Sequence, residues 1–314
     1  MPMTLTSLEH QDRYRGAMLG LACGDALGTT LEFCQRDSRP LQTQLTGGGA
    51  FGVAPGEWTD DTAMALCLAD SLIACQGMDA GDQLERYCRW LDNGYLSCQG
   101  KCIDIGMTTL GALQRYQAQK SDFAGSRDPA LSGNGGIMRL APAVMAATSE
   151  QQAIQVAMDS SRTTHASDDC LDAAALMGAI LWRLLQGQPL SQVLHDLPSV
   201  PMQGTAIARI SQGLFHHLPR DDISSSGYVI DTLEAALWCC SKAGSAEEAI
   251  VRAANLGNDA DTVAAVAGQL AGAAWGASQL PPRWLKRLAW VETITDMADQ
   301  LAGGMASQVE TPSA

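Results

Sequence analysis

Two short segments, far apart in the chain, each place two carboxylates and a threonine at the start of an apolar helical run. Their chemically interesting residues are Thr59, Asp60 and Asp61 in the first and Asp259, Asp261 and Thr262 in the second. Carboxylate and hydroxyl oxygens suit Mg²⁺, Mn²⁺ or Ca²⁺, whereas zinc prefers His and Cys. Because four carboxylates can hold two such ions, the pattern predicts a binuclear divalent-metal site.

Helix capping is the alternative explanation for each segment. Thr and Asp are favoured N-caps, and acids in the first turn complement the helix dipole. A cap needs only one acceptor, however, not two acids and a hydroxyl. If both apolar helices pack in the core, four uncompensated carboxylates would repel one another at buried helix ends. A divalent cation removes that conflict, so we favour the metal interpretation.

A glycine-rich turn and a histidine are further candidates for ligand binding. The turn consists of Ser132, Gly133, Asn134, Gly135 and Gly136. Outward-facing amides at the start of a helix form an anion site suited to a diphosphate, and a flexible loop is the alternative. The histidine, His165, lies in a segment rich in Ser and Thr and either forms structural hydrogen bonds or contributes to binding.

Taken together, these segments resemble the ADP-ribosylglycohydrolase family. The matching pieces are GAMLGLACGDALGTTLEF, WTDDT, SGNGGIMRLAP, THAS and GNDADT, which follow the family order over about residues 15–276. The stretch from Trp90 to Thr109 resembles the branch that contains dinitrogenase reductase-activating glycohydrolase, which cleaves ADP-ribosyl-arginine. The resemblance implies an all-α, single-domain, mostly orthogonal helix bundle with a binuclear Mg²⁺ or Mn²⁺ centre.

The same resemblance implies roles for individual residues. The metal ligands would be Thr59, Asp60, Asp61, Asp259, Asp261 and Thr262. Ser132 and Gly133–Gly136 would hold the diphosphate of ADP-ribose, with His165 nearby. Glu32 matches a glutamate beside the metals, so either Glu32 or Asp61 would deprotonate a water, and Asp104 would exchange a proton with the departing guanidine.

Residues Leu131 and Ser132 differ from the branch that acts on serine-linked and poly-ADP-ribose. That branch has a lysine and an aromatic residue beside the adenine, and this chain has neither there. The difference favours arginine as the attachment residue. We therefore expect an enzyme that releases ADP-ribose from an ADP-ribosylated protein.

Three other functions remain compatible with these motifs. The substrate could be another ADP-ribose conjugate, attached to a small molecule or a nucleic acid. The chain could bind ADP-ribose without catalysis, although a binder does not require the complete set of metal ligands. The metals could also serve a phosphohydrolase, which would release AMP instead of ADP-ribose.

Helical patterns cover most of the chain. Expected helices span 12–27, 61–76, 80–92, 104–119, 137–147, 150–160, 168–187, 189–196, 203–217, 229–243, 246–255, 262–279 and 283–302. The pattern predicts one domain over 1–314, with a core over about 11–302 and a frayed tail over 303–314. In the first helix, Gly16, Gly20, Gly24 and Gly28 recur every fourth residue, which predicts close packing against a neighbouring helix.

Net charge and cysteine usage limit the expected partners and the cellular compartment. A net charge of −14 argues against nucleic acid or an anionic membrane as a partner. The uncharged stretch between Asp261 and Arg283 is rich in Ala and Gly, which favours a buried helix over a membrane span. No CxxC pair occurs among the ten cysteines, and no signal-peptide core is visible at the start, so we expect a cytoplasmic protein.

Overall fold

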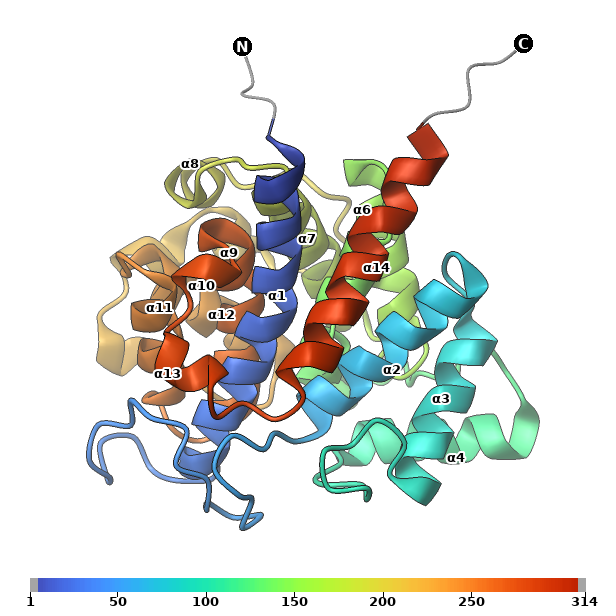
Figure 1. The fold of residues 1–314 in the computed structure, drawn as a ribbon, viewed down its shortest axis with the longest axis horizontal. Helices are drawn as coiled ribbons and strands as arrows, with labels where there is room; N and C mark the ends of the chain where they lie inside the picture. Colours follow the sequence, from blue (N-terminus) through green and yellow to red (C-terminus); the bar gives the residue numbers. More distant parts are fainter. Residues whose placement is uncertain (1–4, 310–314) are drawn as a thin grey trace.

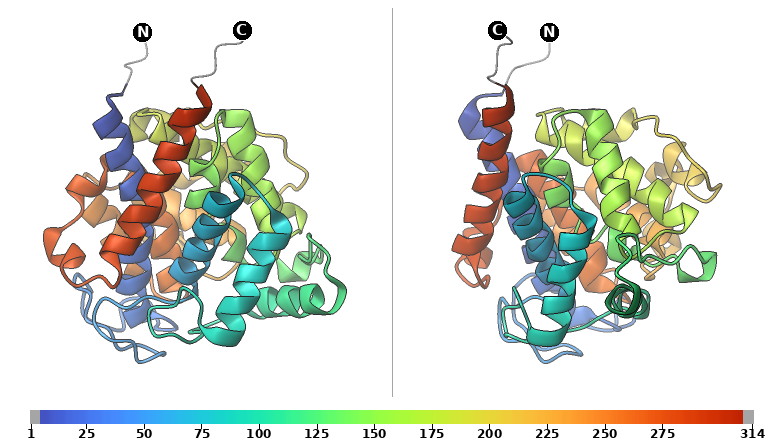
Figure 2. Two further views of the ribbon diagram at one scale, coloured as in Figure 1. Left: turned by 45° about the vertical axis from the view of Figure 1, so that its right-hand side comes forward. Right: turned by 90° about the vertical axis from the view of Figure 1, so that its right-hand side faces the viewer.

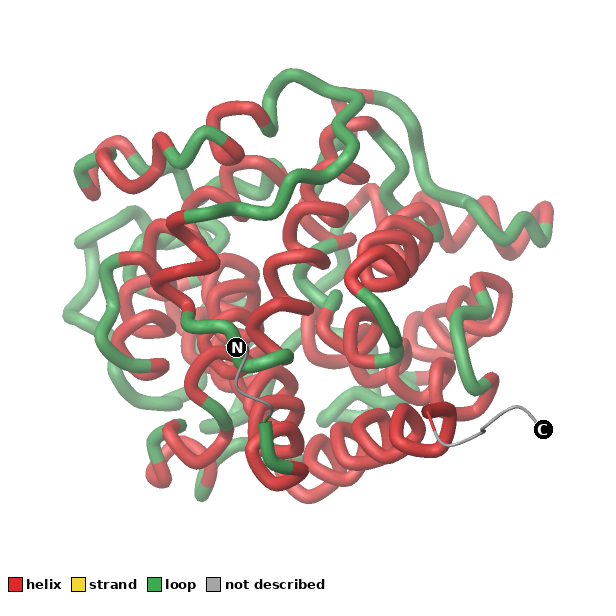
Figure 3. The backbone as a smooth tube through the Cα atoms, turned by 90° about the horizontal axis from the view of Figure 1, so that it is seen from above, coloured by secondary structure: helices red, strands yellow, loops and turns green. Residues whose placement is uncertain are grey.

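The computed structural model describes residues 5–309, and these form fourteen α-helices, six short 3₁₀ turns and no β-strand. Helices occupy every side of the molecule (Figure 3). The all-α prediction is therefore confirmed. The helices are α1 (Ser7–Gly28), α2 (Asp60–Cys75), α3 (Ala80–Asn93), α4 (Met107–Gln119), α5 (Ala141–Met145), α6 (Glu150–Arg162), α7 (Asp168–Leu185), α8 (Leu190–His195), α9 (Ala208–Ser211), α10 (Val229–Ser241), α11 (Ala246–Ala254), α12 (Ala260–Trp275), α13 (Pro282–Leu285) and α14 (Val291–Val309).

A tightly packed pair, α1 and α12, forms the centre of the fold (Figure 1). Gly16 packs against Gly272 and Gly28 against Ala260, so the two helices run antiparallel. A Cβ atom on Gly28 would lie only 2.3 Å from the carbonyl oxygen of Ala260. The expected helix-packing face is thus confirmed. The packing brings the carboxyl end of α1 against the amino end of α12.

The remaining helices enclose this pair in one continuous hydrophobic core. Helix α14 lies on the outer side of α1 and α2 (Figure 2), while α7, α10 and α11 pack against α12. Within residues 5–309, no helix combines the length and apolar composition needed to cross a bilayer. Helix α12 is instead buried along most of its length.

The predicted helix over 137–147 is wrong in its first half. Helix α5 begins only at Ala141, because Pro142 has no amide hydrogen and favours the first turn of a helix. The Gln269 side chain on α12 accepts from the Ala141 amide at 2.8 Å and donates to the Met138 carbonyl at 2.7 Å. These bonds replace the helical ones.

Three other predicted helices are interrupted, and the chain end differs. The 262–279 helix ends at Trp275, Gly276 follows with a φ of 86°, and a 3₁₀ turn spans Ala277–Gln279. The 203–217 helix is reduced to α9 and a 3₁₀ turn, separated by Gly213 in a left-handed conformation. The 283–302 helix is divided into α13 and α14 by Trp290, whose φ is 62°. Helix α14 continues to Val309, beyond the predicted helix end at 302, and 310–314 lie outside the described residues. The frayed tail over 303–314 stays a prediction.

Candidate metal centre and active site

A buried carboxylate on α1, Asp25, caps the amino end of α2. Its oxygens accept the backbone amides of Thr59 at 3.0 and 3.1 Å and of Thr62 at 3.0 Å. They also accept the hydroxyls of Thr59 at 2.8 Å and Thr62 at 2.6 Å. Asp25 thus fixes the position of the helix start that carries Asp60 and Asp61.

A second carboxylate, Glu32, caps the amino end of α12. Helix α1 ends at Gly28 and a 3₁₀ turn follows over Thr29–Leu31, so Glu32 lies in the loop beyond. Its Oε2 accepts the amide of Ala260 at 2.8 Å and approaches that of Asp261 at 3.5 Å. The residue predicted to be catalytic therefore also holds the second acidic segment in place.

The N-cap residues of the two acidic segments do not cap their own helices. Thr59 and Asp259 occupy the N-cap positions of α2 and α12, and neither side chain makes a capping hydrogen bond. Asp25 and Glu32 provide these caps from other parts of the chain, and among the segment acids Asp261 accepts an amide of its own helix, that of Thr262. Capping therefore does not account for the pair of acids in each segment.

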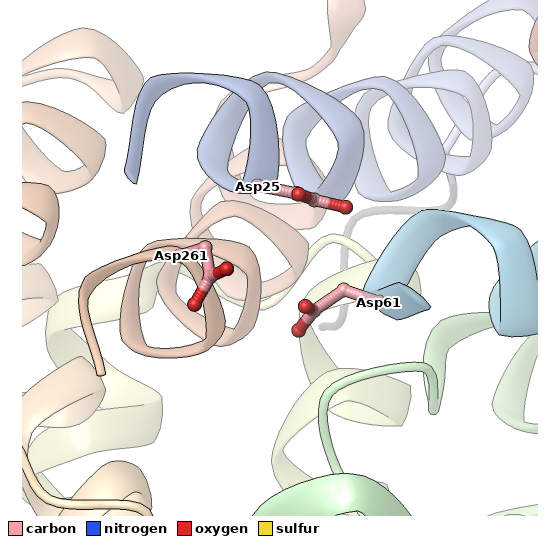
Figure 4. Close-up of side chains that lie close together, drawn as sticks. All are labelled: Asp25, Asp61 and Asp261. Atoms are coloured by element: carbon pink, nitrogen blue, oxygen red, sulfur yellow. The ribbon is translucent and has the colours of Figure 1, made fainter. Parts of the chain in front are cut away.

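These acids converge on one space between three helix ends. Carboxylate oxygens of Asp25, Asp61 and Asp261 lie within 4.8 Å of one another (Figure 4). A second group of Glu32, Asp259 and Asp261 meets the same limit, so Asp261 belongs to both. Two adjacent oxygen clusters with a shared aspartate offer donors of the kind that hard divalent cations prefer.

Unpartnered oxygens give an independent reason to assign a cation here. Asp61 Oδ1 and Asp261 Oδ2 are buried and have no hydrogen-bond partner among the described residues. A buried carboxylate oxygen without a partner is costly, and two facing one another repel. An all-oxygen donor set with two such atoms fits Mg²⁺ or Mn²⁺.

Burial raises the carboxylate pKa values at this site. It raises the pKa of Asp61 and of Asp261 well above the usual range, and the neighbouring carboxylates add to the effect. The pKa of Glu32 rises to about 7 by burial, opposed in part by its hydrogen bonds and increased by the charge of Asp259. Without a cation, the folded site therefore retains protons that an unfolded chain would release.

Asp60 and Asp104 form a separate part of the site. Asp60 belongs to neither oxygen group among the described residues, and after burial the largest contribution to its raised pKa is the charge of Asp104. Asp104 has a left-handed φ of 55°, unusual for a residue other than glycine. Burial raises the pKa of Asp104 to about 6. The long loop before α4 thus directs an acid toward the start of α2.

The threonines of the two segments behave differently. The Thr59 hydroxyl donates to Asp25 at 2.8 Å and lies 3.5 Å from Asp61 Oδ2, so its hydrogen is directed at the carboxylates and its lone pairs face away from them. The Thr262 amide donates to Asp261 Oδ1 at 2.7 Å. Both residues line the site, and their role as metal ligands stays a prediction.

The glycine-rich turn lies beside the second oxygen group. Asn134 Nδ2 donates to Asp259 Oδ2 and to Thr232 Oγ1, each at 2.9 Å. Residues 134–136 form a 3₁₀ turn, not the start of a long helix as predicted. The Ser132 hydroxyl pairs with that of Ser167 at 2.7 Å and points into the protein.

Two amides of this turn have no partner outside it. The N–H groups of Gly135 and Gly136 donate to no acceptor elsewhere in the described chain. A Cβ atom would lie 2.5 Å from the His165 ring at Gly135 and 2.3 Å from the Ser161 hydroxyl at Gly136. Only glycine therefore fits at either position, and the role of the turn as a diphosphate cradle stays a prediction.

His165 supports the turn from beneath. Its ring is buried, and Nδ1 lies 2.9 Å from the hydroxyl of Thr164. Burial and the charge of Arg139 lower its pKa to about 3, so the imidazole is neutral near pH 7. This placement favours a supporting role over proton transfer, and direct contact with ADP-ribose stays a prediction.

Two residues of this site were not among the predicted ones. Asp25 precedes Glu32 by seven residues and is the only charged residue between Gly16 and Gly28, which is a recognisable signal. Tyr228 forms a β-bridge with Gly133 and donates its hydroxyl to Asp169 at 2.6 Å. No local pattern marks Tyr228, because only the fold places its segment along the turn.

Removal of divalent cations is expected to make the stability of the protein fall as pH rises. Glu32 and Asp104 have raised pKa values in the folded state. Their contribution to the free energy of unfolding is therefore full below about pH 4.5 and is lost as pH rises through 6–7. With chelator, the Tm should fall by several degrees between pH 5.5 and 8, since the part of the Glu32 shift within this range is worth roughly 2 kcal/mol. With Mn²⁺ the fall should disappear, because the carboxylates are neutralised as ligands. Parallel pH profiles in thermal unfolding would contradict the assignment.

Sequence similarity to known proteins shows the family of this chain. The sequence matches the ADP-ribosylglycohydrolase family over residues 6–310. It is 42% identical over 299 residues to the ADP-ribosylarginine hydrolase Tri1 of Pseudomonas putida (strain GB-1), covering 95% of this chain and 80% of the relative. It is 31% identical over 290 residues to the ADP-ribosyl-[dinitrogen reductase] glycohydrolase of Rhodospirillum rubrum, covering 90% and 92%.

A solved structure has a similar fold. One described as an ADP-ribosylglycohydrolase-related protein complex has a TM-score of 0.82 and 38% identity, and covers 95% of this chain and 99% of its own. The sequence match and the shared helical architecture thus extend over nearly the whole chain. This protein belongs to the ADP-ribosylglycohydrolase family.

Proposed function

We propose that this protein hydrolyses the N-glycosidic bond between ADP-ribose and a modified arginine side chain of a protein. The observation that carries the proposal is the pair of buried, unpartnered carboxylate oxygens, on Asp61 and Asp261, beside a glycine turn with two amides that have no partner outside it. A cation site next to a diphosphate site matches the distal ribose and the adjoining diphosphate of an ADP-ribosyl group. The name of the Pseudomonas relative, an ADP-ribosylarginine hydrolase, supports arginine as the attachment residue.

The cofactors that fit are two divalent cations, Mg²⁺ or Mn²⁺. We assign Asp61, Asp259 and Asp261 as ligands from the two oxygen groups, and Thr59, Asp60 and Thr262 as further ligands. When bound, the cations would orient the ribose hydroxyls and a water and increase the acidity of that water. Asp25 is a positioning residue in this assignment, because five hydrogen bonds from Thr59 and Thr62 occupy its oxygens.

The protein's own residues account for positioning and proton transfer. The amides of Gly135 and Gly136 would hold the diphosphate and thereby place the distal ribose over the carboxylates. Asn134 donates a hydrogen bond to Asp259 and thereby holds the turn next to the carboxylates. Positioning of this kind converts the attack of water into an effectively intramolecular step.

The reaction exchanges one bond for another at the anomeric carbon. The bond from that carbon to the guanidine nitrogen breaks, and a bond to the water oxygen forms. Glu32 or Asp61 takes a proton from the water, and Asp104 gives one to the departing nitrogen. A pKa of about 6 for Asp104 suits a group that must supply a proton near neutral pH. The surrounding carboxylates also offset the positive charge that develops on the ribose ring.

The proposal also names the partners of the protein and its cellular compartment. The partners are an ADP-ribosylated protein as substrate and ADP-ribose as product, and the net charge of −14 opposes a nucleic-acid substrate. All ten cysteines are free thiols, and several are buried in helices. Free thiols in this number support a reducing cytoplasm.

The decisive measurement is release of ADP-ribose from a protein mono-ADP-ribosylated on arginine. We expect release with Mg²⁺ or Mn²⁺ and none with a chelator, and no comparable release from a serine-modified protein. Release from the serine-linked substrate alone would overturn the arginine assignment. AMP as the product would instead establish a phosphohydrolase, and metal binding with no release from any conjugate would establish a binder.

A further inference from the structure

An exposed aromatic residue stands directly beside the metal centre. Phe33 follows Glu32 in the chain, and 70% of its surface is exposed. Its φ is 61°, a left-handed conformation that costs a residue other than glycine on the order of 1 kcal/mol or more. An apolar ring held in solvent by a strained backbone contributes nothing to the core, so its placement calls for another explanation.

The backbone around Phe33 is fixed by its partners. The Phe33 amide donates to the Asn258 carbonyl at 2.8 Å, and the Asn258 amide donates to the Cys34 carbonyl at 2.8 Å. Asn258 is itself left-handed, with a φ of 58°. On the preceding residue, the Glu32 carboxylate is bound to the Ala260 amide. Glu32 thus points into the metal centre while Phe33 is held outside it.

A second aromatic ring completes the feature. Phe51 lies edge-on to Phe33, with 6.0 Å between the ring centroids and 65° between the planes. The loop that carries Phe51 is fastened to the same segment, because Thr30 donates its hydroxyl to the Gly47 carbonyl and Gly49 packs against the Thr29 carbonyl. The Phe33–Phe51 pair is therefore held against the Glu32 segment.

Further exposed apolar side chains adjoin other predicted site residues. Met107 is 77% exposed and follows Asp104 by three residues, and exposed Leu131 immediately precedes Ser132. Exposed apolar groups next to Glu32, Asp104 and Ser132 come from three separate segments. The interior of the site is anionic and its borders are apolar, which suits a ligand with a polar end mounted on a larger, partly apolar body.

We infer that the Phe33–Phe51 pair binds the polypeptide that carries the modified arginine, next to the attachment point. The inference rests on the proposed function. It adds a specificity feature, the aromatic pair, by which the enzyme would distinguish a modified protein from a small ADP-ribose conjugate. ADP-ribose itself is polar near its distal ribose and gains little from two phenyl rings there. A folded protein presents side chains around its arginine that the rings can cover.

The test compares two substrates in the same metal-loaded enzyme. One is a folded protein mono-ADP-ribosylated on a single surface arginine, and the other is free ADP-ribosyl-arginine. Phe33→Asn removes the ring and keeps a residue that tolerates the left-handed conformation. We expect KM for the protein substrate to rise about tenfold, with kcat and the kinetics on free ADP-ribosyl-arginine within twofold of the original. Phe51→Ser should act in the same direction with a smaller effect.

A matched control and a second readout keep the outcomes distinct. Leu8→Asn removes a side chain that is 77% exposed at the far end of α1 and should change neither substrate. Inhibition by the product ADP-ribose should be unchanged in Phe33→Asn, which also shows that the variant retains its site. Weaker ADP-ribose binding, equal losses on both substrates, or an unchanged KM for the protein would each overturn the inference. Failure of the original enzyme on both substrates would instead overturn the proposed function, and the inference with it.

Discussion

Replacing Asp261 with asparagine is expected to abolish ADP-ribose release and, at the same time, to stabilise the metal-free protein. Asp261 belongs to both oxygen groups, and its Oδ2 is buried without a partner. Loss of this shared ligand should reduce kcat/KM by at least about 10³-fold, since metal assistance contributes several kcal/mol. Removal of the buried charge should raise the unfolding free energy in chelator by about 1–3 kcal/mol.

Calorimetric titration with Mn²⁺, an activity assay and denaturant unfolding in chelator would test both halves of this prediction. Asp196→Asn is the matched control, because it neutralises an exposed aspartate at the end of α8 and should leave all three measurements unchanged. An Asp261→Asn protein that binds Mn²⁺ with the original affinity would disprove the assignment. A less stable metal-free variant would mean that the carboxylate is paired when no metal is bound.

Gly24→Ala is expected to separate the central helix pair. A Cβ atom there would lie 2.1 Å from the carbonyl oxygen and 2.4 Å from the carbonyl carbon of Ala264, and neither backbone atom can move without displacing α12. We expect a loss of about 3 kcal/mol or more in unfolding free energy. Metal binding should weaken as well, because the amino end of α12 carries Asp261.

The control for this substitution is the same exchange in a helix with free space. Gly111 lies within α4, and the nearest atom to its added Cβ would be Arg115 Nη1 at 3.4 Å, the end of a flexible side chain. Gly111→Ala should stabilise the protein by up to about 1 kcal/mol through helix propensity alone. Denaturant unfolding and Mn²⁺ titration measure both variants. A Gly24→Ala protein as stable as the original would show that the helices are not packed as described.

The sequence predicted the acidic segments and the glycine turn because each is contiguous. Thr59–Asp61 and Asp259–Thr262 are visible as local patterns, and the structure places both at helix starts. The four-residue glycine spacing in α1 likewise predicted a packing face. Periodicity could not locate the start of α5, since the bonds that replace the helix come from Gln269, more than a hundred residues away.

Residues whose role depends on distant partners were harder to predict. Asp25 accepts hydrogen bonds from amides 34 and 37 residues further along the chain, and Glu32 accepts one from an amide 228 residues away. The separation also explains why the two segments resembled ordinary helix caps. Tyr228 reaches Gly133 only after α10 has docked, so its place beside the turn depends on the complete fold.

The caps provided from other parts of the chain also have a consequence for the order of folding. The start of α2 is completed only when α1 has docked, and the start of α12 only when the segment after α1 has returned to it. The oxygen groups therefore cannot exist in a partly folded chain that lacks either end. Divalent cations would then act after the rate-limiting step, slowing unfolding and leaving the folding rate nearly unchanged.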